Sequence, residues 1–503
     1  MLMRLILIIM ALCFSHSTAY ASWVEARSKN FIFTGNVSEK KAEIIVNELE
    51  VYREILFEIT NLKESNPEVV PIQIYGFKSS HAIKDITKAA GVSDFAGVYT
   101  TNREGPVFAI NVSSPFTKNS FARAIAYHEY THHLISTYSD LVYPRWYNEG
   151  YADYLSTFHI DKNGFVEIGL PNEFRARALV QARGGWLDMD ILTRAIRKYP
   201  WGKGKSRKNT AKQSLFYAQS WLAVHYLVSK KDYVNKVNRY FKAINQENAP
   251  ENIFETSFGI SPNDFGELLK DYYKKGKYNS LAIKLAKTDY DFDIKTRRLS
   301  KGEVEFHHGE AARRFLGERH GSQISEKYYQ RAIEASYAPA QINASRALIA
   351  IENKDEDSAI KHITAALAQR QNDSRILQIA GHVHLGQYKN IDTASNTTQI
   401  KKARAYLKQA LRANPHNMEA HYDYVSTYAA ANDSASGQAI YSAEECSYYY
   451  KSSNFIDSNL LLAEVLLKNG EFEKAQPILK KAAIWSSSDK IRSQAKSALN
   501  ARH

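Results

Sequence analysis

Apolar residues recur with two different periods along this chain, and the dominant period changes near residue 300. Before that point, short apolar runs between turn residues predict strands, and spacings of three and four predict helices. The predicted strands are 30–35, 70–76 and a pair over 95–112 with a turn at 102–106. The predicted helices are 38–62 with Ser38 as N-cap, 119–138, one that starts near Asn148 after a break at Pro144, and further segments to about residue 275. Strands followed by helices indicate an α+β unit.

From about residue 300, helical periods dominate and similar helix ends recur. These ends are 332–335, 366–368 and 410–413, whose first residues are 34 and then 44 positions apart, with a turn into another helix at 470–475. The pattern resembles tetratricopeptide repeats, of which we expect four or five. A generic helical array is the alternative. The longer spacing predicts an inserted polar loop at 390–398, and stacked helix pairs would present a concave face suited to binding another protein.

The helix predicted over 119–138 carries the pattern His-Glu-x-x-His at His128, Glu129 and His132. Two histidines one helical turn apart project side by side, so they can bind a single metal ion. Glu129 lies about a hundred degrees round the helix from His128, which is the place of a general base for a metal-activated water. The side chain of His133 points one helical step away from that of His132, so we do not expect His133 to be a metal ligand.

The residues after Pro144 extend this pattern, because the order W-x-x-E-G-x-A is present. It is formed by Trp146, Glu149, Gly150 and Ala152. With the preceding motif it resembles the gluzincins, the thermolysin-like and aminopeptidase-like zinc metallopeptidases. The metzincins are excluded, because positions 135 and 138 are isoleucine and tyrosine.

The resemblance implies a site that holds one Zn²⁺ per chain. Its implied ligands are His128, His132 and Glu149, a donor set that leaves one position open for water. Asp153, four residues after Glu149, would orient a zinc histidine, and a solvated charge is the alternative for it. Gly150 would give the two helices room to pack closely.

Two more features follow from the same resemblance. A tyrosine or histidine of a later helix donates a hydrogen bond to the oxyanion in this family, and Tyr217 is the candidate, with His225 in reserve. Plain core packing is the alternative for Tyr217. An edge strand before the metal-binding helix receives the substrate backbone in this family, and residues 105–112 are the candidate. The alternative is an ordinary strand of the sheet.

The first residues have the pattern of a secretory signal peptide. Arg4 is followed by an apolar run over 5–14, and small residues at 19 and 21 predict cleavage after Ala21. A retained membrane anchor is the alternative. No later run approaches about 18 apolar residues, so we expect no transmembrane segment in the mature chain. An exported protein, periplasmic or secreted, is therefore predicted.

The net charge and the cysteine content limit which partners and which disulfides the chain can have. The formal net charge is +13, which favours anionic surfaces or polymers, but no nucleic-acid-binding motif accompanies it. Cleavage of the leader would leave Cys446 as a lone thiol, expected to be half-buried in a repeat. The basic segment 197–212 is expected to be a surface loop that is either solvated or lines the cleft. The pair His307 and His308 is expected at the surface.

The prediction is an α+β zincin-like catalytic domain followed by an all-α tetratricopeptide-like solenoid. Its boundaries are 1–21 for the signal peptide, 22–290 for the metallopeptidase domain and 300–503 for the repeats. The predicted activity is zinc-dependent hydrolysis of a peptide or protein substrate, with a protein partner bound by the repeats and no nucleic acid. The alternative is a non-catalytic envelope binding or assembly protein whose repeats recruit a protein partner.

Overall fold

The computed structural model describes most of the chain. The described residues are 23–60, 62, 70–78, 97–113, 116–117, 120–139, 141–182, 185–194, 207–246, 250–284, 290–316, 318–390, 395–451 and 455–501. The predicted signal peptide and residues 197–206 of the predicted basic loop lie outside these ranges. Among the described helices, none is both long and apolar enough to cross a bilayer.

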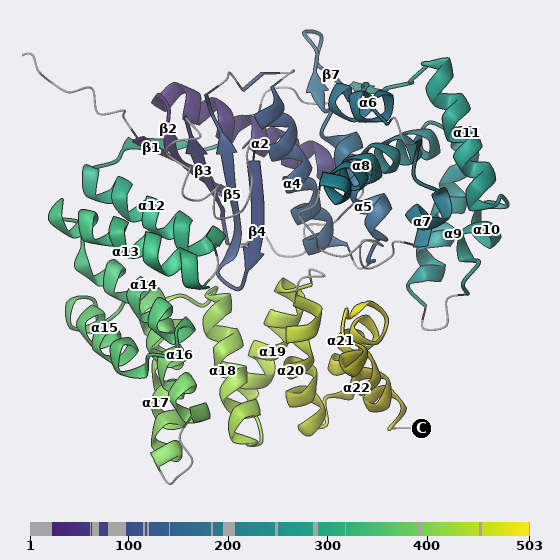
Figure 1. The fold of residues 1–503 in the computed structure, drawn as a ribbon. Coiled ribbons are helices and arrows are strands. Elements are labelled where there is room, and N and C mark those ends of the chain that lie inside the picture. The colour runs from purple at the N-terminus through teal and green to yellow at the C-terminus, as the bar shows by residue number, and fades with distance from the viewer. Residues whose placement is uncertain are drawn as a thin grey trace, which may run out of the picture.

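A six-stranded mixed sheet forms the centre of the first part of the chain (Figure 1). Its strands are β1 (Trp23–Arg27), β2 (Phe31–Asn36), β3 (Ile72–Phe77), β4 (Gly97–Asn102), β5 (Gly105–Asn111) and β9 (Lys295–Arg298), in the order β4-β5-β3-β2-β1-β9. Strands β2, β3 and β5 run parallel, and β4, β1 and β9 pair antiparallel to their neighbours. The sheet thus includes 295–298, which follow the boundary predicted at 290.

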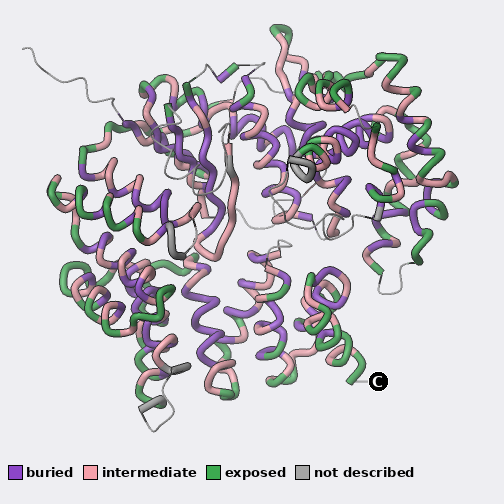
Figure 2. The backbone as a smooth tube through the Cα atoms, in the orientation of Figure 1, coloured by how far each residue is buried: buried purple, intermediate pink, exposed green. Residues whose placement is uncertain are grey.

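Both faces of this sheet are covered, which explains why its inner strands β3 and β5 are largely apolar and buried. On one face, Ile74 and Phe108 pack with helices α2 (Glu39–Thr60) and α4 (Phe121–Tyr138). On the other, Tyr75 and Val107 pack with Ala311 of helix α12 (Lys301–Leu316). Figure 2 shows the buried positions along the sheet. Alternate residues of one strand therefore enter two different cores, as the two-residue period of a strand requires.

The helical predictions for the first part are confirmed with small shifts. Ser38 caps α2 by accepting a hydrogen bond from the Lys41 amide at 3.2 Å. Helix α5 (Arg145–Leu155) starts three residues before the predicted position, because Pro144 occupies its N-cap. The helices that follow are α6 (Glu173–Val180), α7 (Met189–Arg194), α8 (Arg207–Val228), α9 (Val234–Ile244), α10 (Ile253–Phe258) and α11 (Pro262–Lys275), with a 3-10 turn at Lys231–Tyr233.

Several sequence predictions are wrong for the first part. A second small sheet of β6 (His159–Ile160), β7 (Phe165–Ile168) and β8 (Leu281–Lys284) interrupts the expected helices, and β1 and β9 were also missed. Residues 207–212 of the predicted basic loop are the first turns of α8. The expected edge strand 105–112 is internal, because β5 pairs with both β3 and β4, and β4 is the edge.

The second part of the chain is an array of consecutive helix pairs, as predicted. Its described helices are α12, α13 (Glu318–Glu334), α14 (Pro339–Glu352), α15 (Glu356–Gln369), α16 (Ser374–Asn390), α17 (Ser395–Ala413), α18 (Met418–Ala431), α19 (Gly437–Tyr449), α20 (Ile456–Lys468), α21 (Phe472–Trp485) and α22 (Asp489–Asn500). The predicted loop at 390–398 is corrected at its end, since α17 already starts at Ser395, and residues 391–394 lie outside the described ranges. The longer repeat results from longer helices, because α16 has 17 residues and α17 has 19, against 14 each in α14 and α15.

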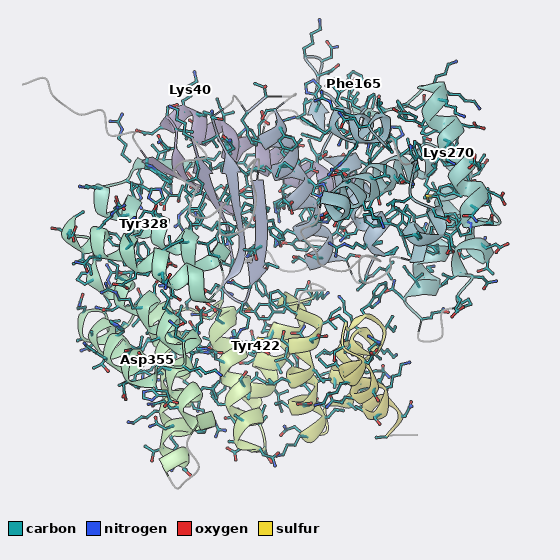
Figure 3. All side chains as sticks on the ribbon, in the orientation of Figure 1. Lys40, Phe165, Lys270, Tyr328, Asp355 and Tyr422 are labelled. Atoms are coloured by element: carbon teal, nitrogen blue, oxygen red, sulfur yellow. The ribbon has the colours of Figure 1, made fainter. Side chains whose placement is uncertain are left out.

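The array curves below the sheet, and the tip of the β4–β5 hairpin points into it (Figure 1). At the tip, Glu104 accepts two hydrogen bonds from Arg313 of α12, at 2.6 and 2.5 Å. Arg103 pairs with Asp423 of α18 at 3.2 Å, and its guanidinium lies 4.9 Å from the ring centre of Tyr422, labelled in Figure 3. The hairpin is therefore bound by the inner helices of the repeat array.

Two local predictions about the repeats also need correction. His307 and His308 are not surface residues, because His308 stacks on Phe77 of the sheet and meets the edge of Trp23. Cys446 is fully buried rather than half-buried, with its thiol 3.7 Å from the Met418 carbonyl. In both cases the contacting residue lies far away in the sequence, so no local pattern predicted the burial.

Candidate metal centre

Two helices supply the residues of the candidate centre. Helix α4 starts at a capped N-terminus, where the Ser120 hydroxyl accepts from the Arg123 amide, and it carries His128, Glu129 and His132. Helix α5 follows after the Pro144 break and carries Glu149. Because each helix presents residues four apart on one face, the short return between them brings both faces together.

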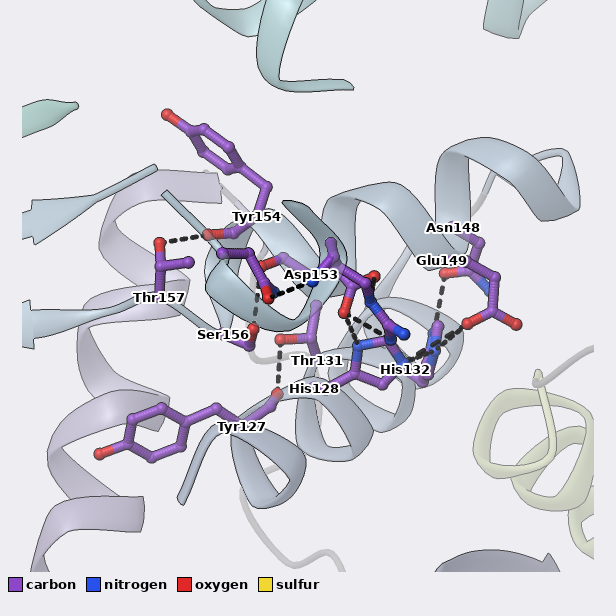
Figure 4. Close-up of polar contacts among 12 residues, drawn as sticks. Tyr127, His128, Thr131, His132, Asn148, Glu149, Asp153, Tyr154, Ser156 and Thr157 are labelled. Atoms are coloured by element: carbon purple, nitrogen blue, oxygen red, sulfur yellow. Dashed lines mark hydrogen bonds and ion pairs between the residues drawn. The ribbon is translucent and has the colours of Figure 1, made fainter. Parts of the chain in front are cut away.

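Three nitrogen and oxygen atoms from these helices converge on one point (Figure 4). His128 Nε2 and His132 Nε2 are 3.1 Å apart. Glu149 Oε2 lies 3.2 Å from His132 Nε2 and 3.4 Å from His128 Nε2. The structure thus brings together the three metal ligands that the sequence resemblance implied, as one compact set of donors.

The other nitrogen of each histidine is held by a side chain of α5. His128 Nδ1 lies 3.0 Å from Asp153 Oδ1, and His132 Nδ1 lies 3.2 Å from Asn148 Oδ1. Both partners are oxygen acceptors, so each Nδ1 donates a hydrogen bond, and each Nε2 is the nitrogen directed at the shared point. Partners of this kind fix the tautomer and the ring orientation of histidines that bind metals.

The donor set fits a zinc ion. Ligand bonds of about 2.0–2.1 Å in a tetrahedral arrangement place neighbouring donors roughly 3.3 Å apart. The three observed separations, 3.1, 3.2 and 3.4 Å, lie at that value. Two neutral imidazoles and one carboxylate form a set that zinc accepts, and three protein ligands leave a fourth position for another molecule.

The carboxylates dominate the electrostatics of the centre. Burial would lower the pKa of His128, but Asp153 and Glu149 outweigh burial and raise that pKa to about 10. Burial would raise the pKa of Glu149, but the two histidines hold it well below its usual range. The pKa of Asp153 is lowered in the same way, against burial, by Arg175 and His128. Negative charge around the donors favours a cation there, which is either a proton on His128 or a metal ion that displaces this proton.

Glu129 lies beside the donor set and is not part of it. Burial raises the pKa of Glu129, with Glu149 and Asp153 adding to the effect against the opposing histidines. Tyr99 of the edge strand β4 is close enough that Glu129 contributes, after burial, to raising the pKa of Tyr99. The strand also packs directly on α4, since a Cβ atom at Gly97 would lie 2.4 Å from Ile125. Strand β4, the edge of the sheet among the described residues, therefore runs beside the candidate base.

Tyr217, the candidate oxyanion donor, lies on α8 next to the outer partners of the centre. The guanidinium of Arg175 lies 4.9 Å from the centre of the Tyr217 ring and binds Asp153 at 2.7 and 2.9 Å. The reserve candidate His225 is fully buried, with its Nε2 2.8 Å from the Gly169 carbonyl oxygen and its Nδ1 2.9 Å from the Tyr272 hydroxyl. His225 is therefore held in the core, whereas Tyr217 remains a candidate.

Gly150 allows a close helix contact, but the partner helix differs from the one expected. A Cβ atom at Gly150 would lie 2.2 Å from the backbone oxygen of Ser220, which belongs to α8. The glycine thus brings α5 against α8, which carries Tyr217, rather than against α4. His133 is buried and stays outside the donor set, in agreement with the sequence prediction.

Three further residues of this site were not predicted from the sequence. Asn148 holds His132, Arg145 lies 3.5 Å from Glu149 Oε1, and Arg175 pairs with Asp153. The spacing of four between Arg145 and Glu149 was a usable signal, because such pairs meet on one helix face. No local signal marks Arg175, which comes from α6, a separate helix.

Comparisons with known proteins identify the repeats. Residues 388–446 match the family model of the tetratricopeptide repeat. No curated protein matches the chain. Among solved structures, a thermophilic TPR protein of Thermus thermophilus is similar at 17% identity, with a TM-score of 0.31, over 39% of this chain and 98% of its own. The family match indicates a tetratricopeptide-repeat region and, through it, interaction with other proteins.

Proposed function

We propose that this chain is an exported zinc-dependent peptidase of the gluzincin type with a zincin-like catalytic domain. The observation that carries the proposal is the convergence of His128, His132 and Glu149 on one point beside Glu129. The donor separations and the held Nδ1 atoms support one zinc ion per chain. When bound there, zinc would supply Lewis acidity toward a carbonyl oxygen and toward water.

Glu129 is the general base of the proposed reaction. Its carboxylate accepts a proton from water as the water oxygen forms a bond to the carbonyl carbon of the peptide. The carbon–nitrogen bond then breaks, and Glu129 delivers that proton to the leaving amine. Burial raises the pKa of the Glu129 carboxyl, and a raised pKa makes its carboxylate a stronger base.

Two other elements complete the proposed site. Tyr217 donates a hydrogen bond to the oxyanion, with its ring held against Arg175. Strand β4 receives the substrate backbone, since its outer edge has no neighbouring strand in the described sheet and it packs on α4. An extended peptide paired with that edge would lie beside Glu129.

A protein-binding role through the repeats is the second candidate, favoured by the family match at 388–446. The two roles are compatible, because a repeat-bound partner could also be a substrate. The hairpin tip already occupies part of the inner surface at Arg313 and Asp423, so a partner would bind elsewhere on the array.

The test is cleavage of a mixed peptide library by the wild-type chain and by Glu129→Gln. We expect wild type to cleave, chelation to stop cleavage, added zinc to restore it, and Glu129→Gln to lose at least about a hundredfold in rate. Glu255→Gln, at an exposed position of α10, is the matched control and should keep full activity. Equal cleavage by Glu129→Gln and wild type would contradict the proposed mechanism.

A further inference from the structure

A cavity lies between the last repeats and the first part of the chain, away from the metal centre. It has a volume of about 460 Å³ and is bordered by α19, α20 and α21 together with Leu141 and Asn245. Ligand pockets commonly measure about 300–1,000 Å³ and occur at junctions between domains. Its size and place therefore suit a ligand-sized group.

The wall at this junction is fixed by hydrogen bonds. Asn245 Oδ1 accepts from the Val142 amide at 3.1 Å and from Trp485 Nε1 at 3.0 Å. The Asn245 side-chain amide donates back to the Val142 carbonyl at 2.9 Å. On the repeat side, Lys481 Nζ donates to the Lys451 carbonyl at 2.6 Å. These contacts fix the wall of the cavity, so little ordering of the wall is needed on binding.

The described lining of the cavity is strongly positive. It includes Lys451, Lys474, Lys480 and Lys481, and no aspartate or glutamate is among the described lining residues. Lys474 also pairs with Glu444 and Glu471 just outside the lining. A concave surface lined by one sign of charge concentrates ligands of the opposite sign. The cavity therefore favours an anionic ligand.

The other lining residues restrict which chemical groups the ligand must carry. Apolar side chains such as Ile456, Ile478 and Trp485 form much of the surface, so the ligand must also carry apolar groups. Asn459 is nine-tenths buried and donates to the Tyr450 carbonyl at 2.8 Å, while its Oδ1 has no partner among the described residues. A buried acceptor of this kind calls for an N–H donor.

We propose that this cavity binds an acidic peptide segment of a protein partner, with a carboxylate at the lysines, an apolar side chain on the isoleucine and tryptophan surface, and a backbone N–H at Asn459. A peptide supplies all three groups. The phosphate of an anionic lipid would satisfy the lysines but brings no amide donor to Asn459. The proposal concerns binding alone and does not depend on peptidase activity.

The test uses the full chain with Glu129→Gln, so that any hydrolysis is blocked, and measures fluorescence anisotropy. The probe is a short labelled peptide that alternates glutamate and leucine, and its counterpart has glutamine at each glutamate. We expect the Lys451→Glu/Lys480→Glu double variant to raise the Kd of the acidic peptide at least about tenfold. Lys361→Glu/Lys402→Glu makes the same charge change at exposed positions outside the cavity and should leave the Kd within about twofold.

A photo-crosslinking version of the acidic peptide gives an independent readout. Mass spectrometry should find the label on α19, α20 or α21, which border the cavity. The proposal is overturned by equal weakening in the two double variants, by equally tight binding of the glutamine peptide, or by a label on other helices. Binding of phosphatidylglycerol vesicles without binding of the peptide would also overturn it.

Discussion

At the residue scale, the candidate centre depends on the second nitrogen of each histidine as much as on the first. Asp153 binds His128 Nδ1 and is itself held by two hydrogen bonds from Arg175. Asn148 has the same role for His132 with an uncharged oxygen. The two ligands thus differ in the charge of their outer partners, and His128 receives the stronger support.

Replacement of Asp153 by asparagine tests this support. Loss of such an outer partner typically costs about 10–100-fold in metal affinity, and we expect Asp153→Asn to weaken zinc binding by that factor, measured by competition with a chromophoric chelator. The matched control is Asp291→Asn, at an exposed position. Unchanged zinc affinity in Asp153→Asn would contradict the role given to this carboxylate.

Gly150 is the second residue whose effect can be measured. A methyl group there would meet the Ser220 carbonyl at 2.2 Å, and neither backbone can give way without separating α5 from α8. We expect Gly150→Ala to lower the free energy of unfolding by about 1–3 kcal/mol in denaturant titration. Gly437→Ala, where nothing lies within 4 Å of the added carbon, should change it by less than about 0.5 kcal/mol. Similar effects of both substitutions would argue against a tight α5–α8 contact.

At the scale of elements, the β4–β5 hairpin links the sheet to the repeats. Arg313 is 7% exposed and binds both Glu104 of the hairpin and Glu310 of its own helix. Glu310 in turn accepts a hydrogen bond from Tyr329 of α13. The edge strand beside Glu129 is thus fixed at its far end by the repeat array.

Removal of Arg313 should loosen this link. Truncation of one partner of a buried ion pair leaves the other charges uncompensated, at a cost of about 3–5 kcal/mol. We expect Arg313→Ala to speed hydrogen–deuterium exchange at 97–111 relative to wild type. Arg346→Ala breaks an ion pair with the half-exposed Glu326 and should leave exchange at 97–111 unchanged. Equal exchange in all three chains would show that the repeats do not hold the hairpin.

Glu419 of α18 adds a pH dependence to the same interface. Burial, followed by Glu104 and Asp423, raises its pKa to about 7 against Arg103 and Arg375. The folded state therefore binds the proton of the Glu419 carboxyl more tightly than the unfolded chain does. Protonated Glu419 contributes to the free energy of unfolding at low pH, and this contribution is lost as the pH rises from about 4.5 to about 7.

A glutamine at position 419 cannot ionise and should remove this loss. We expect Glu419→Gln to exceed wild type in unfolding free energy at pH 8 by on the order of 1 kcal/mol, and to show little difference near pH 5. Denaturant titration at both pH values measures this difference in unfolding free energy, and Glu473→Gln, at an exposed position, is the control. A difference that is the same at both pH values would contradict the raised pKa.

Local signals predicted the long helices and the strands β2 to β5, whereas the short strands and the long-range pairings were missed. Ser38, Pro144 and the histidine spacing act within one or two helical turns, so the sequence alone placed α2, α4 and α5. The order of strands in the sheet depends on contacts across the chain, such as β1 with β9, which no local pattern encodes. For the same reason, the edge strand was assigned to β5 instead of β4.

The residues of the candidate site also fall into those that a local pattern predicts and those that depend on long-range contacts. His128, His132 and Glu149 could be predicted because one motif and the next helix contain them all. Arg175 could not, since its partner Asp153 lies on another helix and many arginines of the chain lie on the surface. The burial of His308 was missed because the surface that covers it, Trp23 and Phe77, comes from the sheet.

At the scale of the whole molecule, the repeats are part of the fold of the first half. Helix α12 covers one face of the sheet, the inner helices bind the hairpin, and Trp485 of α21 bonds to Asn245. The array is therefore fixed relative to the candidate metal centre. A partner bound in the lysine-lined cavity between them would be held at a constant place relative to the β4 edge.

The central claim is a zinc ion bound by His128, His132 and Glu149, and zinc content per chain tests it most directly. Elemental analysis should be made on wild type, Glu129→Gln and His132→Ala after dialysis against trace zinc. We predict about one zinc per chain in wild type and in Glu129→Gln, and a large loss in His132→Ala, because only the last variant removes a ligand. Absence of zinc from the wild-type chain, or equal zinc in wild type and His132→Ala, would contradict the account.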